Sequence, residues 1–225
     1  FWPGPLTIIL KKKKNSKISN LVSNKSNLVG CRIPSNKLAN KLITLLDMPI
    51  AAPSANLSER TSVTNIMDID PILDKKIFVL KDKQSTLGLE STVVKIDNKN
   101  RIEVLRYGSI TVEDLNKFAK VKIKKKSSIS PGNLKKHYST LKPIRMNAKK
   151  ILKDEGLLNF GSNKLRSNII NLNLSNKKNL NEAAKNFYHY LHKLDQSRCK
   201  KIAVVEIPNK GLGKTINDRL RRAIK

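Results

Sequence analysis

The sequence predicts an α/β protein with two domains and a linker between them. Short apolar segments typical of strands alternate with amphipathic segments typical of helices, which is the pattern of layered α/β architectures. The chain has 225 residues, and at about 150 residues per domain this length fits one large or two modest domains. We expect a first domain in residues 1–118, a linker in residues 119–147 and a second domain in residues 148–225.

The first domain begins with a predicted strand at residues 6–10, after the breakers Pro3 and Pro5. Residues 15–27 are rich in Asn, Ser and Lys, and we interpret them as a loop or a solvent-exposed hairpin. Apolar residues then recur with helical spacing over residues 38–46, which predicts a helix.

Three further strands are predicted in this domain, at residues 77–80, 92–96 and 102–105. Residues 97–100 have the composition of a turn between the last two. A helix is expected to begin at Thr111, because two acidic residues follow where the helix dipole favours anions.

The second domain has the clearest helix of the chain. Residues 119–147 show no clear periodicity and carry a Pro-Gly pair, so we interpret them as the linker. A strand is predicted at residues 168–174, and a buried parallel strand at residues 202–207. A basic helix is expected at residues 215–224. The clear amphipathic helix has apolar residues at positions 180, 183, 184, 187, 188, 191 and 194.

The composition is strongly basic, with a formal net charge of +29. A polyanion-binding surface and a Lys-, Asn- and Ile-rich compositional bias both explain this charge, and a selected surface would be clustered in sequence or space. No apolar run approaches the roughly 18 residues of a membrane span, so a transmembrane protein is excluded. The two cysteines, Cys31 and Cys199, do not suffice for a disulfide scaffold, and we expect a reducing cytoplasm.

The chain begins Phe1-Trp2-Pro3-Gly4-Pro5, without an initiator Met and without a signal peptide. We interpret this as the start of a fragment or of a processed chain.

Three local motifs have ordinary structural explanations. Gly213-Lys214-Thr215 resembles the end of a phosphate-binding loop, but Pro208 stands where that pattern needs its first glycine. His189 and His192 are three residues apart on a helix and lack further metal ligands nearby, so we interpret them as helix-surface histidines. Cys31 is interpreted as a small buried residue.

Two other features have the chemistry of an anion site, although each alone also fits an ordinary turn or ion pair. The segment 53–58, Pro-Ser-Ala-Asn-Leu-Ser, offers hydroxyl, amide and backbone N–H donors. Arg32 and Arg106 each follow an apolar run, where a guanidinium requires a carboxylate or a phosphate. The segment Glu90-Ser91-Thr92 at the start of a strand is equally ambiguous by itself.

Taken together and in order, the motifs resemble a known family. The segments are Phe1–Thr7, Arg32–Pro34, Ala52–Ser58, Gly88–Val94 and Leu105–Ile110, followed by Ser130–Ser139, Gly211–Gly213 and Asn217–Ala223. This series closely resembles the YrdC-like threonylcarbamoyl-AMP synthases, in their long two-domain subtype, and covers essentially the whole chain.

The resemblance implies an open, twisted YrdC-like α/β sheet domain and a smaller Rossmann-like α/β C-terminal domain, with the linker as a lid. It implies a nucleotidyltransferase that condenses L-threonine, bicarbonate and ATP into threonylcarbamoyl-adenylate and releases pyrophosphate. A separate transferase complex would then move the threonylcarbamoyl group to the adenosine next to the anticodon of tRNA. Mg²⁺ is expected with the ATP phosphates.

The resemblance also assigns roles to individual residues. Threonine or carbamate would be bound by Arg32, Ser54 and Ser91. ATP would be held by Asn56, Thr64 and Arg106, and Tyr138 on the linker would close over it.

The sequence departs from the family at several places. The family's N-terminal motifs are absent, so we expect this chain by itself to adenylate poorly. Leu28, Glu59, Val63 and Tyr107 replace usual family residues, which weakens the nucleotide assignments more than the threonine ones. Two alternatives stay open. One is a non-catalytic YrdC-like module that binds RNA weakly, and the other is a carbamoyl-transferring relative, which the two-cysteine count disfavours.

Overall fold

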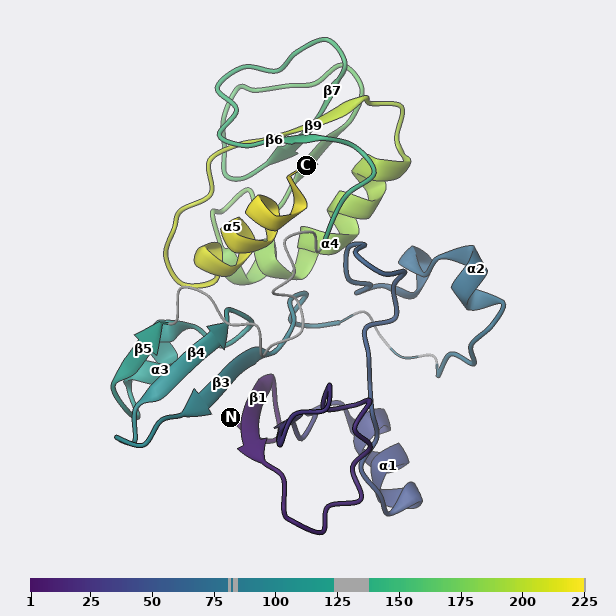
Figure 1. Ribbon diagram of the computed structural model, residues 1–225. Helices are drawn as coiled ribbons and strands as arrows, with labels where there is room; N and C mark the ends of the chain where they lie inside the picture. Colours follow the sequence, from purple (N-terminus) through teal and green to yellow (C-terminus); the bar gives the residue numbers. More distant parts are fainter. Residues whose placement is uncertain (81, 83–84, 124–137, 225) are drawn as a thin grey trace. The chain divides into compact units, whose positions relative to one another are not determined.

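The computed structural model describes residues 1–80, 82, 85–123 and 138–224, and the chain divides into two compact units (Figure 1). Unit 1 comprises Phe1–Pro53 and Glu90–Asn133, and unit 2 comprises Ser54–Leu89 and Leu134–Lys225. Residues 124–137 of the linker predicted at residues 119–147, including His137, lie outside the described residues. No described helix has the length and apolar character needed to span a membrane.

Unit 1 is built on a five-stranded mixed sheet with the order β2-β1-β3-β4-β5. The central pair β1 and β3 is parallel, as is the edge pair β4 and β5, while β1–β2 and β3–β4 are antiparallel. The strands are β1 (Leu6–Lys11), β2 (Leu28–Cys31), β3 (Thr92–Ile96), β4 (Ile102–Arg106) and β5 (Val121–Ile123). The predicted strands at residues 6–10, 92–96 and 102–105 are therefore confirmed.

Successive side chains of a strand point to opposite faces of the sheet. The central strands carry consecutive apolar residues, so both faces of the sheet are apolar near its centre. One face carries a core of buried residues to which helix α3 (Val112–Asn116) contributes Leu115, only 1% exposed. The opposite face carries a smaller cluster of Ile9, Val93 and Leu105. The predicted helix start is confirmed, since Thr111 is the N-cap of α3 in a capping box.

The predicted helix at residues 38–46 is also confirmed, as α1 (Lys37–Leu46). Its N-cap is Asn36, whose side-chain oxygen accepts a hydrogen bond of 2.8 Å from the backbone N–H of Ala39.

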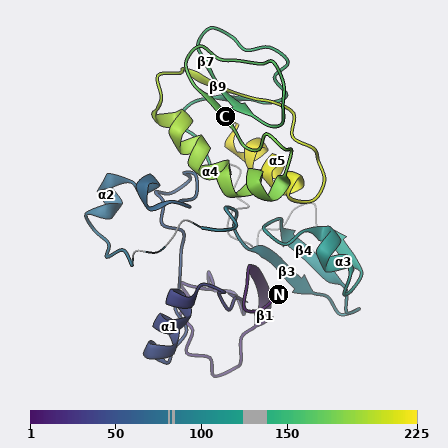
Figure 2. The same ribbon diagram turned by 180° about the vertical axis from the view of Figure 1, so that it is seen from behind.

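Unit 2 contains a four-stranded parallel sheet with the order β6-β9-β7-β8. Helices α4 (Leu180–Gln196) and α5 (Leu212–Ala223) lie side by side along this sheet (Figures 1 and 2). The strands are β6 (Ile144–Arg145), β7 (Glu155–Asn159), β8 (Asn171–Asn173) and β9 (Lys201–Val204). The buried parallel strand predicted at 202–207 is confirmed as β9, and the basic helix at 215–224 as α5.

Helix α4 has the amphipathic pattern that its sequence predicts. Its buried residues are Ala183, Ala184, Phe187, Tyr188, Leu191 and Leu194, which match six of the seven apolar positions. They pack into the main core of unit 2 together with strands β7 and β9. Burial of a continuous apolar stripe is the main source of helix stability here.

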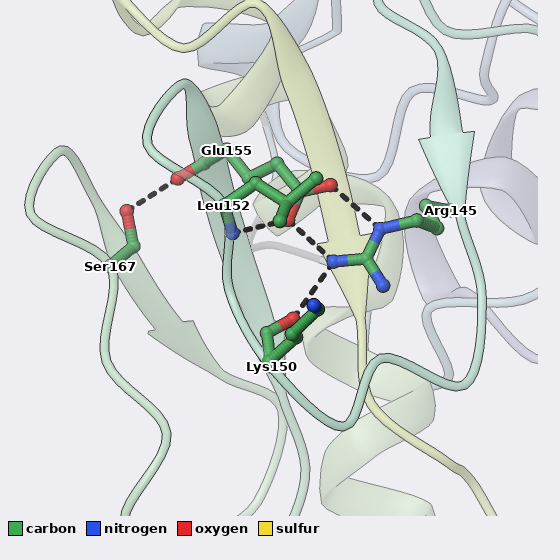
Figure 3. A network of polar contacts seen from close by, with 5 residues as sticks. All are labelled: Arg145, Lys150, Leu152, Glu155 and Ser167. Carbon is green, nitrogen blue, oxygen red and sulfur yellow. Dashed lines mark hydrogen bonds and ion pairs between the residues drawn. The ribbon is translucent and has the colours of Figure 1, made fainter.

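A buried ion pair connects β6 to β7 (Figure 3). Glu155 accepts hydrogen bonds from Arg145 Nε at 2.7 Å and Nη2 at 2.6 Å, and a third from the backbone N–H of Leu152 at 2.9 Å. The hydrogen bonds from Arg145 are the largest influence on Glu155 and hold its pKa below the usual value. The same bonds raise the pKa of Arg145. The bidentate geometry offsets the cost of burying the carboxylate.

The segment between the two halves of unit 1 contains a short 3₁₀ turn η1 (Ile66–Asp68) and helix α2 (Pro71–Asp74). The strand predicted at residues 77–80 is wrong. Phe78 is 90% exposed, and no strand of the described chain pairs with this run. An isolated apolar run without a neighbouring strand does not form stable β-structure.

Candidate functional site

The sheet register of unit 1 brings three of the predicted site residues together. Val93 of β3 lies opposite Arg106 of β4 and also opposite Thr7 of β1. Ser91 immediately precedes β3, and Arg32 immediately follows β2, whose last residue Cys31 pairs with Ile8. Residues from four different chain segments therefore meet at the same end of these strands.

Ser91 is the centre of a hydrogen-bond cluster. Its hydroxyl lies 2.7 Å from the hydroxyl of Thr7 and accepts a bond of 3.1 Å from Nη2 of Arg106. Its carbonyl oxygen accepts from Nη2 at 2.9 Å and from Nε at 3.3 Å of the same guanidinium. Because Ser91 is buried, these bonds fix the direction of the Arg106 side chain.

A β-bulge explains why Arg106 reaches Ser91. Val94 pairs with Val104, whereas Val93 pairs with Arg106, so that Leu105 is an extra residue in β4. In a regular ladder Leu105 and Arg106 would point to opposite faces, but a bulge lets both lie toward the same face. Leu105 packs on Val93 in the small core, and Arg106 is left beside Ser91.

Arg32 supplies a second guanidinium to this cluster. In the described part of the chain it has no hydrogen-bond or ion-pair partner, and as a residue it is exposed. Partial desolvation of the guanidinium and, second, the neighbouring positive charge of Arg106 lower the pKa of Arg32. Two arginines that repel each other create a positive site, and the group that best fits it is a carboxylate or a phosphate.

Gly108 allows the backbone after β4 to approach the backbone of Glu90 and Ser91 closely. A Cβ atom at this position would lie 2.3 Å from the backbone C of Ser91 and 2.5 Å from the carbonyl oxygen of Glu90. The adjoining Ser109 N–H donates to that same carbonyl at 2.9 Å, and Thr92 exchanges two hydrogen bonds with the backbone of Ile110. The backbone approach thus requires glycine.

The other predicted ligands, Ser54, Asn56, Thr64 and Tyr138, belong to unit 2. Asn56 uses its amide N–H groups to close the loop, donating to the carbonyls of Leu57 at 2.8 Å and Arg60 at 3.1 Å. Its Oδ1 and the Oγ1 of Thr64 are buried without a hydrogen-bond partner in the described part of the chain. Such atoms are unusual in folded proteins and suit a bound polar group. Ser54 is exposed.

Tyr138 lies in the core of unit 2 and is 1% exposed. Its ring lies below the guanidinium of Arg219, 4.6 Å from the ring centroid, and 6.0 Å from the ring of Tyr188. Arg219 is itself 1% exposed and forms an ion pair of 2.6 Å with Asp218. These contacts anchor the end of the linker to helix α5.

The two histidines of α4 bind a loop of the same unit. Nδ1 of His189 lies 2.9 Å from the buried carboxylate of Asp68, and Nε2 of His192 lies 3.2 Å from the hydroxyl of Thr61. The sequence did not indicate these partners, because Asp68 is 121 residues away from His189. Both side chains are partly buried rather than simply exposed on the helix surface.

Thr7 is the site residue that the sequence analysis missed. Its hydroxyl is the single polar group in the apolar run at residues 6–10, and this was the only sign of a role in the site. The neighbours of Thr7 across the sheet become known only from the strand register.

Two protein-family models match consecutive parts of the chain. A family model described as "Telomere recombination" matches residues 1–108, and one described as "Threonylcarbamoyl-AMP synthase, C-terminal domain" matches residues 110–224.

Several curated relatives are named threonylcarbamoyl-AMP synthase. The one from Pyrococcus abyssi is 27% identical over 99% of this chain and 71% of its own length. Those from Bacillus subtilis and Schizosaccharomyces pombe are 36% and 34% identical over 64% and 62% of this chain, and over 43% and 38% of their own lengths.

Solved structures give the same result. The crystal structure of P. abyssi Sua5 complexed with L-threonine has a TM-score of 0.85 to this chain at 26% identity, and covers 99% of this chain and 71% of its own. A variant of that protein, with a histidine and the adjacent tyrosine replaced by alanine, has a TM-score of 0.80.

Proposed function

Since the chain belongs to the threonylcarbamoyl-AMP synthase family, a family of enzymes, we propose that it condenses L-threonine, bicarbonate and ATP into threonylcarbamoyl-adenylate and releases pyrophosphate. The observation that carries this proposal is the pair of guanidiniums at the end of the unit 1 sheet. Arg32 has no anionic partner in the described chain, and partial desolvation of its guanidinium together with the charge of Arg106 lowers its pKa.

In the proposed reaction the threonine amine attacks the carbon of bicarbonate, and water leaves to give a carbamate. A carbamate oxygen then attacks the α-phosphorus of ATP, and pyrophosphate leaves. Both steps gather negative charge, so positioning and electrostatic stabilisation would supply most of the rate.

Within unit 1, Arg32 would bind the carboxylate of threonine and Ser91 would line the threonine pocket. Arg106 would bind the nucleotide phosphates, and the bulge together with Ser91 and Thr7 would hold its side chain in place. The hydrogen bonds of 2.9 and 3.1 Å from Arg106 to Ser91 support these roles, because they place the proposed phosphate-binding residue next to the proposed threonine pocket.

Within unit 2, Asn56 and Thr64 would contact the nucleotide. Their buried oxygens without protein partners support this assignment, because a ligand would satisfy them. Ser54 would line the threonine or carbamate pocket, and Tyr138 would serve the ATP site by anchoring the end of the linker under Arg219.

The donors that the cluster in unit 1 offers, guanidiniums and hydroxyls, do not fit a divalent cation. Mg²⁺ is therefore proposed only as a companion of the ATP phosphates, held by their oxygens and by water. We also propose a cytoplasmic location, which the two free thiols, Cys31 and Cys199, support. A separate transferase complex would accept the product for tRNA modification.

Isothermal titration of this chain with L-threonine tests the proposal. L-threonine should bind with measurable heat, and L-threonine amide, which lacks the carboxylate, should bind at least about tenfold more weakly because a charge-assisted bond contributes about 1.5–3 kcal/mol. Equal affinity for both compounds, or no binding of either, would contradict the role of Arg32.

A further inference from the structure

Helix α4 holds the segment of unit 2 that carries the proposed nucleotide ligands Asn56 and Thr64. This segment, the nucleotide loop, comprises residues 54–68 and ends with the turn η1. It lies beside α4 in both views of the chain (Figures 1 and 2). The loop belongs to the part matched by the first family model and α4 to the part matched by the C-terminal one. Side chains of the C-terminal part therefore contact a candidate ATP-binding segment of the first part.

His192 binds the middle of the nucleotide loop. Its Nε2 lies 3.2 Å from the hydroxyl of Thr61 and 3.3 Å from the carbonyl oxygen of Ser62. A carbonyl oxygen only accepts hydrogen bonds, so Nε2 of His192 carries the hydrogen and donates it. Thr61 and Ser62 are both buried, so water competes little for this bond.

His189, one turn earlier on α4, binds the end of the loop. Its Nδ1 lies 2.9 and 3.1 Å from the two carboxylate oxygens of Asp68, whose side chain is 4% exposed. An N–H that donates to a carboxylate forms a stronger bond than one that donates to a neutral acceptor. Thr64 lies between Ser62 and Asp68 in the sequence, so the two histidines fix the loop on both sides of this proposed ligand.

The contact of His192 also controls the direction of Asn56. The amide of Asn56 donates to the carbonyl of Arg60 at 3.1 Å, and Arg60 directly precedes Thr61, which His192 holds. The position of this carbonyl orients the amide and hence its Oδ1. That oxygen and the Oγ1 of Thr64 are the two buried loop atoms that lack a hydrogen-bond partner within the described residues. The backbone of residues 60–62 thus connects α4 to the atoms that would meet the nucleotide.

We propose that His189 and His192 are positioning residues for ATP binding. They hold the nucleotide loop in the conformation that presents Asn56 and Thr64 to the nucleotide, and neither histidine itself contacts ATP. This inference rests on the proposed function, in which those two residues bind the nucleotide. A loop that is ordered before ATP arrives loses less conformational entropy on binding, so the histidines raise the affinity for ATP.

A purely structural role, in which the histidines only attach the loop to α4, is the competing explanation. The chain that follows the loop already has a firm attachment of its own. Leu89 is part of the main core of unit 2, and a Cβ atom at Gly88 would overlap the carbonyl oxygen of Ala184 on α4. The histidines therefore add contacts inside the loop itself. Hydrogen bonds are directional, so these contacts fix an orientation, which attachment alone does not require.

The test uses three variants of this chain. The first replaces both histidines, His189→Ala and His192→Ala, and so removes both anchors. The second, His189→Asn with His192→Gln, keeps an amide N–H near the positions of Nδ1 and Nε2. The control is Asn186→Ala, because Asn186 is a partly buried residue of α4 that donates to the carbonyl of Leu174, outside the loop, at 3.0 Å.

Isothermal titration with ATP and Mg²⁺, and separately with L-threonine, measures the effect. Each hydrogen bond shifts the loop equilibrium by about 2- to 12-fold, so the alanine variant should bind ATP at least about tenfold more weakly. L-threonine should bind nearly as in the wild type, because Arg32 of unit 1 would hold its carboxylate. The Asn/Gln variant should recover ATP binding to within about threefold. The control should bind ATP normally although its thermal midpoint falls.

Unchanged ATP affinity in the alanine variant would overturn the proposal. Equal weakening in the control, or loss of the folded state of the alanine variant in circular dichroism, would also overturn it, because lost stability would then explain the effect. Failure of the Asn/Gln variant to recover binding would exclude positioning through these hydrogen bonds. If the wild type does not bind ATP, the nucleotide roles of Asn56 and Thr64 fall together with this proposal, whereas the L-threonine titration tests the site at Arg32 separately.

Discussion

The substitution Arg32→Met should have opposite effects on ligand binding and on stability: it should weaken the binding of L-threonine and slightly stabilise the fold. In the bound state its guanidinium would form charge-assisted hydrogen bonds to the threonine carboxylate. Loss of such bonds costs about 1.5–3 kcal/mol, so the affinity for L-threonine should fall about 10- to 150-fold.

Without ligand, the same side chain should slightly destabilise the fold. Its pKa is lowered because the folded state partly desolvates the guanidinium and places it near Arg106. The charged form is therefore less favourable in the folded than in the unfolded chain. Because Arg32 is exposed, solvent screens this penalty, and removing the charge should stabilise the chain by only about 0.5 kcal/mol.

Thermal unfolding followed by circular dichroism measures the second effect. For a chain of this size the midpoint should rise by about 1–2 °C in Arg32→Met, and the rise should shrink in high salt as the repulsion is screened. Arg101→Met is the matched control, since Arg101 forms an ion pair of 2.7 Å with Asp97. That variant should be slightly less stable and should bind threonine normally. A fall in the midpoint of Arg32→Met by several degrees would show that Arg32 has a structural partner and would refute the reasoning.

Three further substitutions give different signatures. Glu155→Gln should lower the unfolding midpoint by about 4–8 °C at pH 7, because breaking a buried ion pair whose Arg145 is partly exposed costs about 2 kcal/mol. Since the folded pKa of Glu155 is depressed below its unfolded value near 4.5, the wild type should lose this stability as pH falls below 4.5, and calorimetry of the variant should show a flatter profile there. Gly108→Ala should lower the free energy of unfolding in urea by about 1–3 kcal/mol, because its Cβ would overlap the backbone of Ser91; an unchanged midpoint would contradict the close approach. Thr7→Val should weaken threonine and nucleotide binding together while Thr7→Ser retains both, and equal binding by all three proteins would exclude a positioning role.

The sequence predicted elements whose stability is local or follows a strong pattern. Helix α4 has an apolar stripe over four turns, and the N-cap Thr111 is followed by the acidic residue that its capping box requires. Strand β9 was recognised because the run at residues 202–207 is apolar except at Glu206, and such short runs are typical of parallel strands buried on both faces.

Elements that depend on distant partners were not predicted. Strands β5 and β6 are two or three residues long and lie in the range read as linker. Strand β7 begins with Glu155 and Gly156, which do not suggest a strand until Arg145 neutralises the carboxylate. The run at 77–80 looked like a strand, but none of the strands in the described residues pairs with it.

In the candidate site, too, local motifs were predicted and features that depend on distant partners were not. Arg32, Ser91 and Arg106 were expected from motifs, and the register of four strands explains how they meet. The bulge at Leu105 and the contribution of Thr7 could not be inferred, because both depend on the register between strands.

Pyrophosphate release tests the central claim most directly. The protein, expressed with any coding sequence that precedes Phe1 in its gene, is supplied with ATP and bicarbonate, with and without L-threonine, and is compared with its Arg32→Met variant. The account predicts release that requires threonine and is lost in the variant. Release without threonine, equal release by the variant, or no release by the folded protein would contradict it.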